Sequence, residues 1–266
     1  MSIIREDVPD YTVSQLFSRL DCGFALSMPR IGERIDDLRI YINVELLNVR
    51  EFYVGGVKDE YKPAALGGPQ VIRFDEPAAL LPVTGCINFD RGWVDKPSAS
   101  YIDLFPLDPI PLDPMPLIAL TLHEMAHVLG IGVGTAWNSF GPALNSSNDQ
   151  HFNGPLAIAA FDAAGGQNYT GAKVPVEPDR AHWRAPVLSG EIMGGGRDRK
   201  VSAITIQALA DMGYVVDVGQ ADPYTLPGAS ATKIVAFPYD WMCGGQMQGP
   251  VYMVDQQGRV IRTLSH

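Results

Sequence analysis

The sequence predicts an α+β fold in which a mixed β-sheet, built by the N-terminal half, supports one long apolar helix. Residues 38–45, LRIYINVE, alternate apolar and polar side chains with the period of two of a β-strand. Residues 117–134, LIALTLHEMAHVLGIGVG, place apolar side chains at helical spacing and then reach three glycines, which end a helix. The chain beyond residue 134 is rich in turn-forming residues, so we expect a loop-rich second lobe.

The remaining elements of the N-terminal half are shorter. Apolar periodicity predicts a helix over Tyr11–Leu20, and apolar runs bounded by Gly, Pro and Asp predict strands over Gln70–Phe74 and Gly85–Phe89. The proline-rich repeat Pro106–Met115 cannot lie inside a helix. We interpret it as an extended linker to the helix start at Pro116, with a proline-rich recognition segment as the alternative.

Two helices and a hairpin are predicted after residue 134. An alanine-rich run predicts a helix over Pro155–Ala164, and Ser202 is placed to cap a second helix over Ala203–Met212, which Gly213 would end. Near the C-terminus, two apolar runs around Gln-Gln-Gly predict a β-hairpin. We expect an N-terminal extension (1–33), a two-lobed domain (34–224, N-lobe to about residue 134 and C-lobe after it) and a C-terminal appendage packed on the domain (225–266).

The charge balance disfavours two classes of partner. Thirty acidic residues against twenty basic ones give a formal net charge of −10, whereas nucleic acids and anionic membranes reward a basic surface. No apolar run is long enough to span a bilayer, and the first residues lack the pattern of a signal peptide. We therefore expect a cytoplasmic protein by default, or an extracellular one if a leader was removed; the oligomeric state stays open.

The three cysteines, Cys22, Cys86 and Cys243, are widely spaced and odd in number. At most one disulfide could form, so the chain is not a disulfide scaffold, and the spacing is not that of a thiolate zinc site. We expect all three to be small buried apolar residues.

The long helix carries the motif His-Glu-Met-Ala-His, the H-E-x-x-H pattern of zinc peptidases. An α-helix advances about 100° per residue, so His123 and His127 lie one turn apart on one face and can bind one ion. Glu124 is too far round the helix to be the natural third ligand, but it can reach a metal-activated water as general base. A solvated helix face is the ordinary alternative. The flanking residues are almost all apolar, however, so we favour the metal site.

The opposite face of this helix carries an apolar stripe of four residues, Ile118, Leu122, Met125 and Leu129. Their spacing follows the helical repeat, so they share one side. We expect this stripe to anchor the helix in the core while the histidine face stays available for chemistry.

A catalytic zinc needs a third protein ligand and an open position. Of the remaining histidines, His266 is the last residue and His151 lies in a polar run typical of an exposed loop. Glu191 would suit peptidases that use a glutamate, but it is followed by Met193 and three glycines, which are typical of a turn. His182 has an aromatic neighbour and precedes that methionine turn, so it is the favoured third ligand.

These motifs resemble the metzincin peptidases, which combine H-E-x-x-H-x-x-G with a later turn carrying methionine. Most metzincins place the third histidine three residues after that glycine, where this chain has Val133. A third histidine beyond a long insertion is a mark of the leishmanolysin family, and the chain is similar to its bacterial branch over roughly Arg34–Tyr224. The matching segments are 81–90, the long helix through Trp137, 174–177, 182–183, 191–193, 202–205 and 209–214.

The resemblance implies a zinc-dependent endopeptidase with peptide or protein substrates, and a two-lobed metzincin-like fold with its cleft between the lobes. It also implies that Met193 lies beneath the metal as a structural residue. Three cysteines cannot supply the disulfide network of the eukaryotic members, and nothing around Cys22 marks it as a zinc-blocking thiol. The alternatives are a catalytically silent zinc- or peptide-binding module and a zinc hydrolase of a non-protein substrate.

Overall fold

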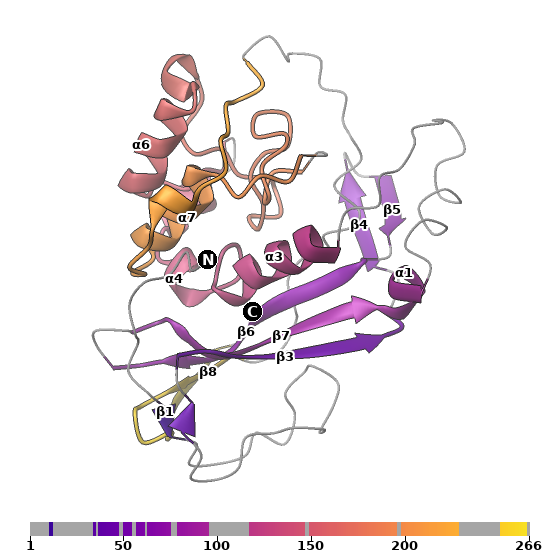
Figure 1. The fold of residues 1–266 in the computed structure, drawn as a ribbon, viewed down its shortest axis with the longest axis vertical. Helices are drawn as coiled ribbons and strands as arrows, with labels where there is room; N and C mark the ends of the chain where they lie inside the picture. The colour runs from indigo at the N-terminus through magenta and orange to yellow at the C-terminus, as the bar shows by residue number, and fades with distance from the viewer. Residues whose placement is uncertain are drawn as a thin grey trace.

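The computed structural model of this protein is an α+β fold with a mixed five-stranded sheet. It describes residues 11–12, 34–35, 37–47, 50–54, 57–61, 63–75, 79–95, 117–146, 149–195, 198–228 and 251–264. Helix α3 (Leu117–Val128) lies between the sheet on one side and a second layer of helices and loops on the other (Figure 1). The α+β class predicted from the sequence is therefore confirmed.

The described strands, in chain order, are β1 (Tyr11–Thr12), β2 (Arg34–Ile35), β3 (Arg39–Glu45), β4 (Arg50–Val54), β5 (Val57–Tyr61), β6 (Ala65–Arg73), β7 (Pro82–Asp90), β8 (Val251–Val254) and β9 (Val260–Leu264). The helices, besides α3, are α1 (Arg91–Asp95), α4 (Thr135–Asn138), α5 (Gly141–Leu144), α6 (Pro155–Ala163) and α7 (Ala203–Asp211), with short 3-10 turns η1 (Gly166–Asn168) and η2 (Val218–Gln220).

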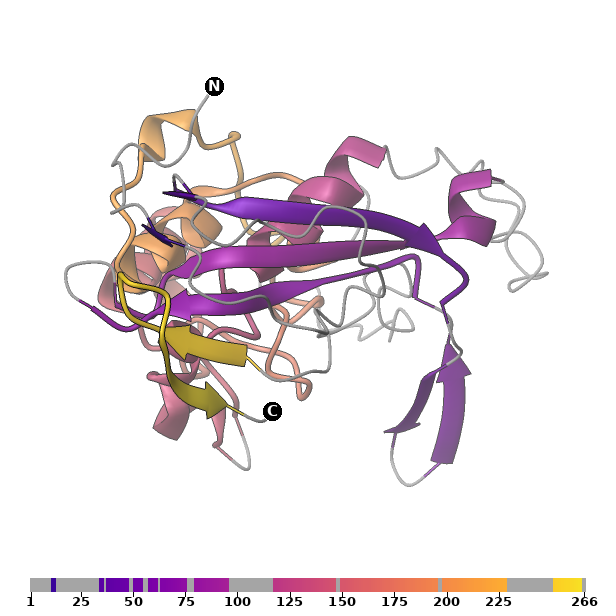
Figure 2. The ribbon, with the colours of Figure 1, turned by 90° about the horizontal axis from the view of Figure 1, so that it is seen from below.

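The main sheet has the strand order β3-β7-β6-β8-β9. The β3–β7 and β6–β8 pairs are parallel, and the β7–β6 and β8–β9 pairs are antiparallel. Seen from below, β3, β7 and β6 lie side by side, and the C-terminal hairpin continues the same sheet (Figure 2). The hairpin predicted near the C-terminus is thus present, and its strand β8 pairs with Val71–Arg73 of β6. The β4–β5 hairpin stands apart from the main sheet (Figure 2).

The two central strands are longer than the sequence predicted. The expected strands over residues 70–74 and 85–89 overlap β6 and β7, which have nine residues each and are buried along their whole length. The first half of β6 was not predicted because it contains Gly67, Gly68 and Pro69, which are typical of turns. Gly67 has a steric role here, since a Cβ at this position would lie 2.5 Å from the carbonyl oxygen of Glu124. Gly85 of β7 has the same relation to Val128 of α3, where a Cβ would meet Cγ1 at 2.5 Å.

The expectation that the apolar stripe anchors α3 holds for only two of its four residues. Ile118 is 73% exposed and Leu122 is 38% exposed, and Met125 and Leu129 are only partly buried. The helix is covered from two sides, by the sheet and by the C-lobe, so its buried arc includes the histidines. Leu120 and Val128, both 0% exposed, anchor the helix in the core instead. Ile118 and Leu122 therefore lie on the outward side of α3, whereas Met125 and Leu129 pack against the edge of the core.

The C-terminal end of α3 forms the hydrogen bonds that the glycine-rich sequence predicts. The Gly130 N–H donates to the carbonyl of His127 at 2.9 Å, and the Ile131 N–H donates to the carbonyl of Ala126 at 3.0 Å. These two bonds are those of a Schellman motif. The φ of Gly130 is +112°, a backbone conformation that residues with a Cβ rarely adopt. The helix consequently ends at Val128, directly after its second histidine.

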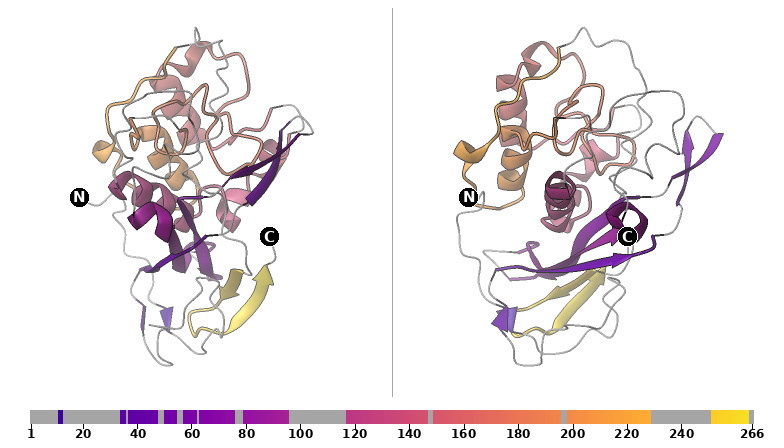
Figure 3. Two further views of the ribbon diagram at one scale, coloured as in Figure 1. Left: turned by 90° about the vertical axis from the view of Figure 1, so that its right-hand side faces the viewer. Right: turned by 45° about the vertical axis from the view of Figure 1, so that its right-hand side comes forward.

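The layer formed by the chain after residue 134, which we call the C-lobe, contains the paired helices α6 and α7, which stack above α3 (Figure 3). Both predicted helices are present, and the Ser202 hydroxyl caps α7 by accepting from the Ile204 N–H. At the other end of α7, the Asp211 carboxylate accepts from the N–H groups of Leu156 and Ala157 in the first turn of α6. This contact ties the two helices together. The lobe therefore has its own hydrogen-bonded frame as well as a shared apolar core.

The structure corrects two further expectations, one for Tyr11 and Thr12 and one for Cys86. Tyr11 and Thr12 pair with β2 as a short strand rather than starting a helix, because Tyr11 and Thr12 oppose Ile35 and Arg34. Cys86 is buried as expected, but it is disulfide-bonded rather than a simple apolar residue. Residues 13–20, the repeat at 106–115, Cys22, Cys243 and His266 lie outside the described residues. None of the helices in the described part of the chain is long and apolar enough to cross a membrane.

Candidate metal centre

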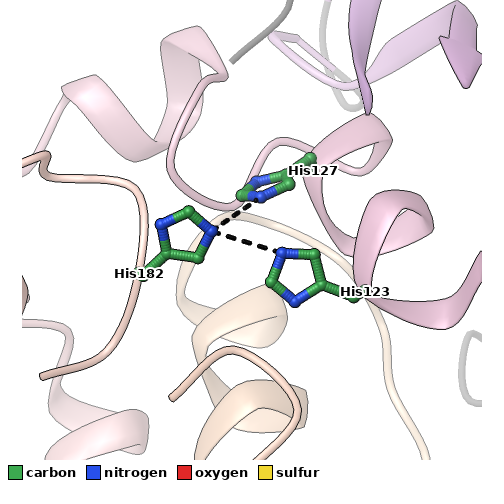
Figure 4. A group of neighbouring side chains, drawn as sticks. All are labelled: His123, His127 and His182. Atoms are coloured by element: carbon green, nitrogen blue, oxygen red, sulfur yellow. Dashed lines mark hydrogen bonds between the residues drawn. The ribbon is translucent and has the colours of Figure 1, made fainter. Parts of the chain in front are cut away.

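Three histidine side chains from two distant segments converge between the lobes. His123 and His127 come from consecutive turns of α3, and His182 comes from a loop 55 positions after His127. The Nε2 atom of His182 lies 3.2 Å from Nε2 of His123 and 3.3 Å from Nε2 of His127 (Figure 4). The ligand atoms of the three rings all lie within 4.8 Å of one another, so the group could hold a metal ion.

The two helical histidines each direct Nδ1 away from this centre. The Nδ1 of His123 lies 2.8 Å from the carbonyl oxygen of Ile192, and the Nδ1 of His127 lies 2.7 Å from that of Ile131. A carbonyl oxygen only accepts, so Nδ1 carries the proton in both rings. Each Nε2 atom therefore presents a lone pair to the centre, which is the form of imidazole that binds metals.

The third histidine is oriented by a carboxylate. The Nδ1 of His182 donates to Oδ2 of Asp179 at 2.7 Å, and the backbone N–H of Ala181 donates to Oδ1 at 2.8 Å. Burial raises the pKa of Asp179, but the His182 charge and these hydrogen bonds outweigh it and hold that pKa below its ordinary value. The carboxylate thus stays ionised and fixes the ring, as the outer partners of metal-bound histidines commonly do.

The three Nε2 atoms at the centre require a positive charge between them. Burial, followed by the neighbouring imidazoles, lowers the pKa of His123 well below its ordinary value, and burial lowers the pKa of His127 to about 3. Both rings are therefore neutral at neutral pH. Lone pairs that face each other at 3.2–3.3 Å repel unless a positive charge lies between them. Either a proton on Nε2 of His182 or a metal ion supplies that charge.

The segment that carries His182 packs against the loop that follows α3. A Cβ at Gly132 would lie 2.5 Å from the carbonyl oxygen of Ala181, so only glycine allows this approach. The indole N–H of Trp137 donates to the carbonyl of Arg180 at 3.0 Å. Trp183 is 1% exposed and packs on Trp137, with ring centroids 5.4 Å apart. The loop is thus held on both sides of the histidine.

Glu124 is fully buried on the same helix. Its side chain is 0% exposed, and a Cβ at Gly67 of β6 would come within 2.8 Å of its Oε2. Glu124 follows His123 by one residue, so it is rotated about 100° from that histidine toward the sheet. It is not a member of the group that could hold a metal among the described residues.

The methionine turn is joined by hydrogen bonds to His123 and to Trp183, the residue after His182. Met193 is 1% exposed, and its carbonyl accepts from the backbone N–H of Trp183 at 3.0 Å. The Glu191 carboxylate is 0% exposed and accepts from the Met193 N–H at 2.6 Å. Burial raises the pKa of Glu191 to about 7, although hydrogen bonds from Thr205, Met193 and Ser202 oppose this shift.

The structure separates the other candidate ligands from the centre. His151 directs Nδ1 to the carbonyl of Asp149 at 2.8 Å and forms an isolated bridge with Pro175. Glu191 directs both carboxylate oxygens into hydrogen bonds with its own turn and with α7. Neither residue belongs to the three-histidine group. His266 lies outside the described residues.

Asp179 was missed by sequence reasoning. An aspartate three residues before a candidate ligand is a local pattern that could have been found, since a short turn can return its carboxylate to the ring. The partners of Glu191, Ser202 and Thr205, lie more than ten positions away and have no such pattern.

Comparisons with protein-family models, with curated proteins and with solved structures find no match to this chain.

Proposed function

We propose that this protein is a zinc-dependent endopeptidase in which His123, His127 and His182 hold the ion and Glu124 is the general base. The observation that carries the proposal is the convergence of three Nε2 lone pairs, with every Nδ1 proton already donated elsewhere. Three imidazoles that meet at their Nε2 atoms are a donor set that suits a catalytic zinc. The side chain of His182 is 14% exposed, whereas His123 and His127 are 1% and 0% exposed, so His182 is the ligand with contact to solvent.

A bound zinc ion would supply Lewis-acid chemistry, polarising a peptide carbonyl and lowering the pKa of water to about 7. The chain's own residues would orient the ligands and accept the proton. The carbonyls of Ile192 and Ile131 and the carboxylate of Asp179 would hold the three rings in one tautomer. Glu124 would accept a proton from the attacking water at its carboxylate. Its buried position next to Gly67 would restrict that carboxylate to few rotamers.

We further propose a leishmanolysin-like, metzincin-type arrangement of these parts. The support is the H-E-x-x-H helix, a third histidine that a distant loop brings to it, and a buried methionine next to Ile192, whose carbonyl accepts from His123. Met193 would act as a structural residue in this arrangement. A peptide or protein is the substrate class that this resemblance favours.

A catalytically silent metal-binding module and a hydrolase of a non-protein substrate are the competing functions. Against a silent module stands Glu124, because a carboxylate that is 0% exposed costs stability and a purely structural metal site needs no base. The choice between peptide and non-protein substrates depends on the residues that line the cleft, and only the motif resemblance favours peptides.

The test is metal analysis of the purified protein together with digestion of a denatured protein substrate, with and without a chelator. We expect about one zinc per chain and cleavage that the chelator abolishes and added zinc restores. Glu124→Gln should retain the metal and lower the cleavage rate about 10²- to 10⁴-fold, which is typical of a lost general base. Glu45→Gln, on the partly exposed face of β3, is the matched control and should cleave normally. Peptide cleavage at the parental rate in Glu124→Gln would refute the proposed mechanism.

A further inference from the structure

Glu191 has four hydrogen-bond donors around one fully buried carboxylate. Its Oε2 atom accepts from the Met193 N–H at 2.6 Å. Its Oε1 atom accepts from the Thr205 hydroxyl at 2.5 Å, the Ser202 hydroxyl at 2.9 Å and the Ser202 N–H at 3.3 Å. The proposed reaction uses none of these contacts. Burying a carboxyl group costs free energy, and the four donors offset part of that cost.

The first consequence of these contacts reaches His123. Holding the Met193 N–H fixes the peptide bond between Ile192 and Met193, because N–H and C=O of one peptide lie in one plane. The carbonyl of that same peptide, Ile192 C=O, accepts from Nδ1 of His123 at 2.8 Å. Glu191 therefore sets the position of the acceptor that orients the first helical histidine.

The second consequence reaches His182 through its neighbour. The Thr205 hydroxyl that donates to Glu191 also accepts from the indole N–H of Trp183 at 2.9 Å. The backbone N–H of Trp183 donates to the carbonyl of Met193 at 3.0 Å. Trp183 is thus attached at both its backbone and its side chain to groups that Glu191 holds, and it directly follows His182 in the chain.

We propose that Glu191 is a positioning residue that sets the geometry of His182 relative to His123. The inference rests on the proposed metal centre and extends it. The carboxylate links the methionine turn to α7, and through Ile192 and Trp183 it reaches one ligand from each lobe. The third ligand, His127, is oriented by Ile131 next to its own helix and does not depend on this network.

A glutamine cannot replace this carboxylate without loss. If the amide oxygen takes the place of Oε1, the amide N–H₂ faces the Met193 N–H, and two donors oppose each other. If the oxygen takes the place of Oε2, the amide faces the Ser202 N–H, which also only donates. Glu191→Gln therefore removes one backbone contact in either orientation while keeping the side-chain volume.

The test uses Co²⁺ as the metal probe, because its visible absorption bands report ligand geometry. Parent, Glu191→Gln and Asp211→Asn proteins are titrated with Co²⁺, and affinity is measured by competition with a chelator. Asp211 is the matched control, since its carboxylate also accepts backbone N–H groups between α7 and α6 but has no link to the histidines. We expect Glu191→Gln to alter the Co²⁺ bands and weaken binding about 10- to 100-fold, which is typical for residues that orient metal ligands. Asp211→Asn should keep the parental spectrum.

Thr205 provides an independent variant if Glu191→Gln fails to fold. Thr205→Val removes the hydroxyl that joins Glu191 to Trp183 and should also change the Co²⁺ spectrum. Thr205→Ser keeps the hydroxyl and should show the parental spectrum. Parental spectra and affinities in Glu191→Gln, or in Thr205→Val where Glu191→Gln does not fold, would overturn the inference and leave the proposed function standing. A parent protein that binds no Co²⁺ would instead refute the metal centre, and the inference with it.

Discussion

The two histidines on α3 and the histidine on the C-lobe loop reach the same centre by different physical routes. His123 and His127 are placed by the helix repeat, and Leu120 and Val128 on the same helix are fully buried. His182 has no such support from regular secondary structure. Its ring depends on Asp179, and its neighbour Trp183 depends on the methionine turn and Thr205. The spacing of the two helical histidines is therefore locally determined, whereas His182 and the ring orientation of His123 depend on tertiary contacts.

This difference predicts where the centre is vulnerable. Damage to the C-lobe network should displace His182 and alter the ring orientation of His123, while leaving His127 in place. Binding of the ion and packing of the lobes should also be coupled, because the ligands come from both lobes.

The largest of three expected effects concerns pH and the loop half of the centre. The pKa of Glu191 is about 7 in the fold against an ordinary 4.5, mainly because of burial. A carboxyl whose pKa rises on folding stabilises the fold below its unfolded pKa, and that contribution is lost as pH rises through the folded pKa. Between pH 5 and pH 8, the unfolding free energy of metal-free parent should fall by about 2 to 3 kcal/mol relative to Glu191→Gln.

Chemical denaturation of both proteins at the two pH values measures this difference. The comparison between variants cancels the titration of groups that both share. A difference that stays constant from pH 5 to pH 8 would contradict the raised pKa.

The next effect concerns the carboxylate that orients the loop histidine. Asp179→Asn keeps the side-chain shape, but an amide in place of the carboxylate holds the His182 ring more weakly. We expect zinc affinity to fall about 10- to 100-fold, as is typical when such a partner is lost. Asp162→Asn is the control, because Asp162 pairs with Lys173 at 2.6 Å elsewhere in the lobe. Isothermal titration would show equal affinities for both variants if Asp179 had no orienting role.

The smallest effect is expected at the methionine turn. Met193→Leu replaces one buried apolar side chain with another of similar volume, and the hydrogen bonds of the turn involve only its backbone. We expect metal content to be unchanged and stability to fall by about 1 kcal/mol or less. Loss of the metal in this variant would show that the sulfur itself binds the ion.

The features that could be predicted from the sequence are those that local patterns determine, and the features that depend on tertiary contacts could not be predicted. The H-E-x-x-H spacing, the end of α3 at Gly130 and the cap at Ser202 are local patterns, and each is present as predicted. The buried side of α3 was not predictable. The sequence of the helix does not reveal that the sheet and the C-lobe cover the faces outside the apolar stripe. Ile118 therefore points outward at 73% exposure while His123 is 1% exposed.

The missed features are those that depend on contacts between distant segments. Gly67 reads as a turn residue in the sequence, and only the approach of Glu124 shows why β6 needs glycine there. The disulfide at Cys86 and the Glu191 network likewise require the folded chain. His182 was favoured over His151 from its neighbours, and the structure brings it to the other two histidines. Its function as a metal ligand remains the central proposal.

The most direct test of that proposal is the zinc content of single alanine variants after dialysis. His127→Ala serves as the reference for a lost ligand, and His151→Ala serves as the control, since His151 lies in the same lobe as His182 but outside the group. We expect His182→Ala to lose zinc as completely as His127→Ala, while His151→Ala retains one ion per chain. Zinc retained in His182→Ala, or lost in His151→Ala, would contradict the account.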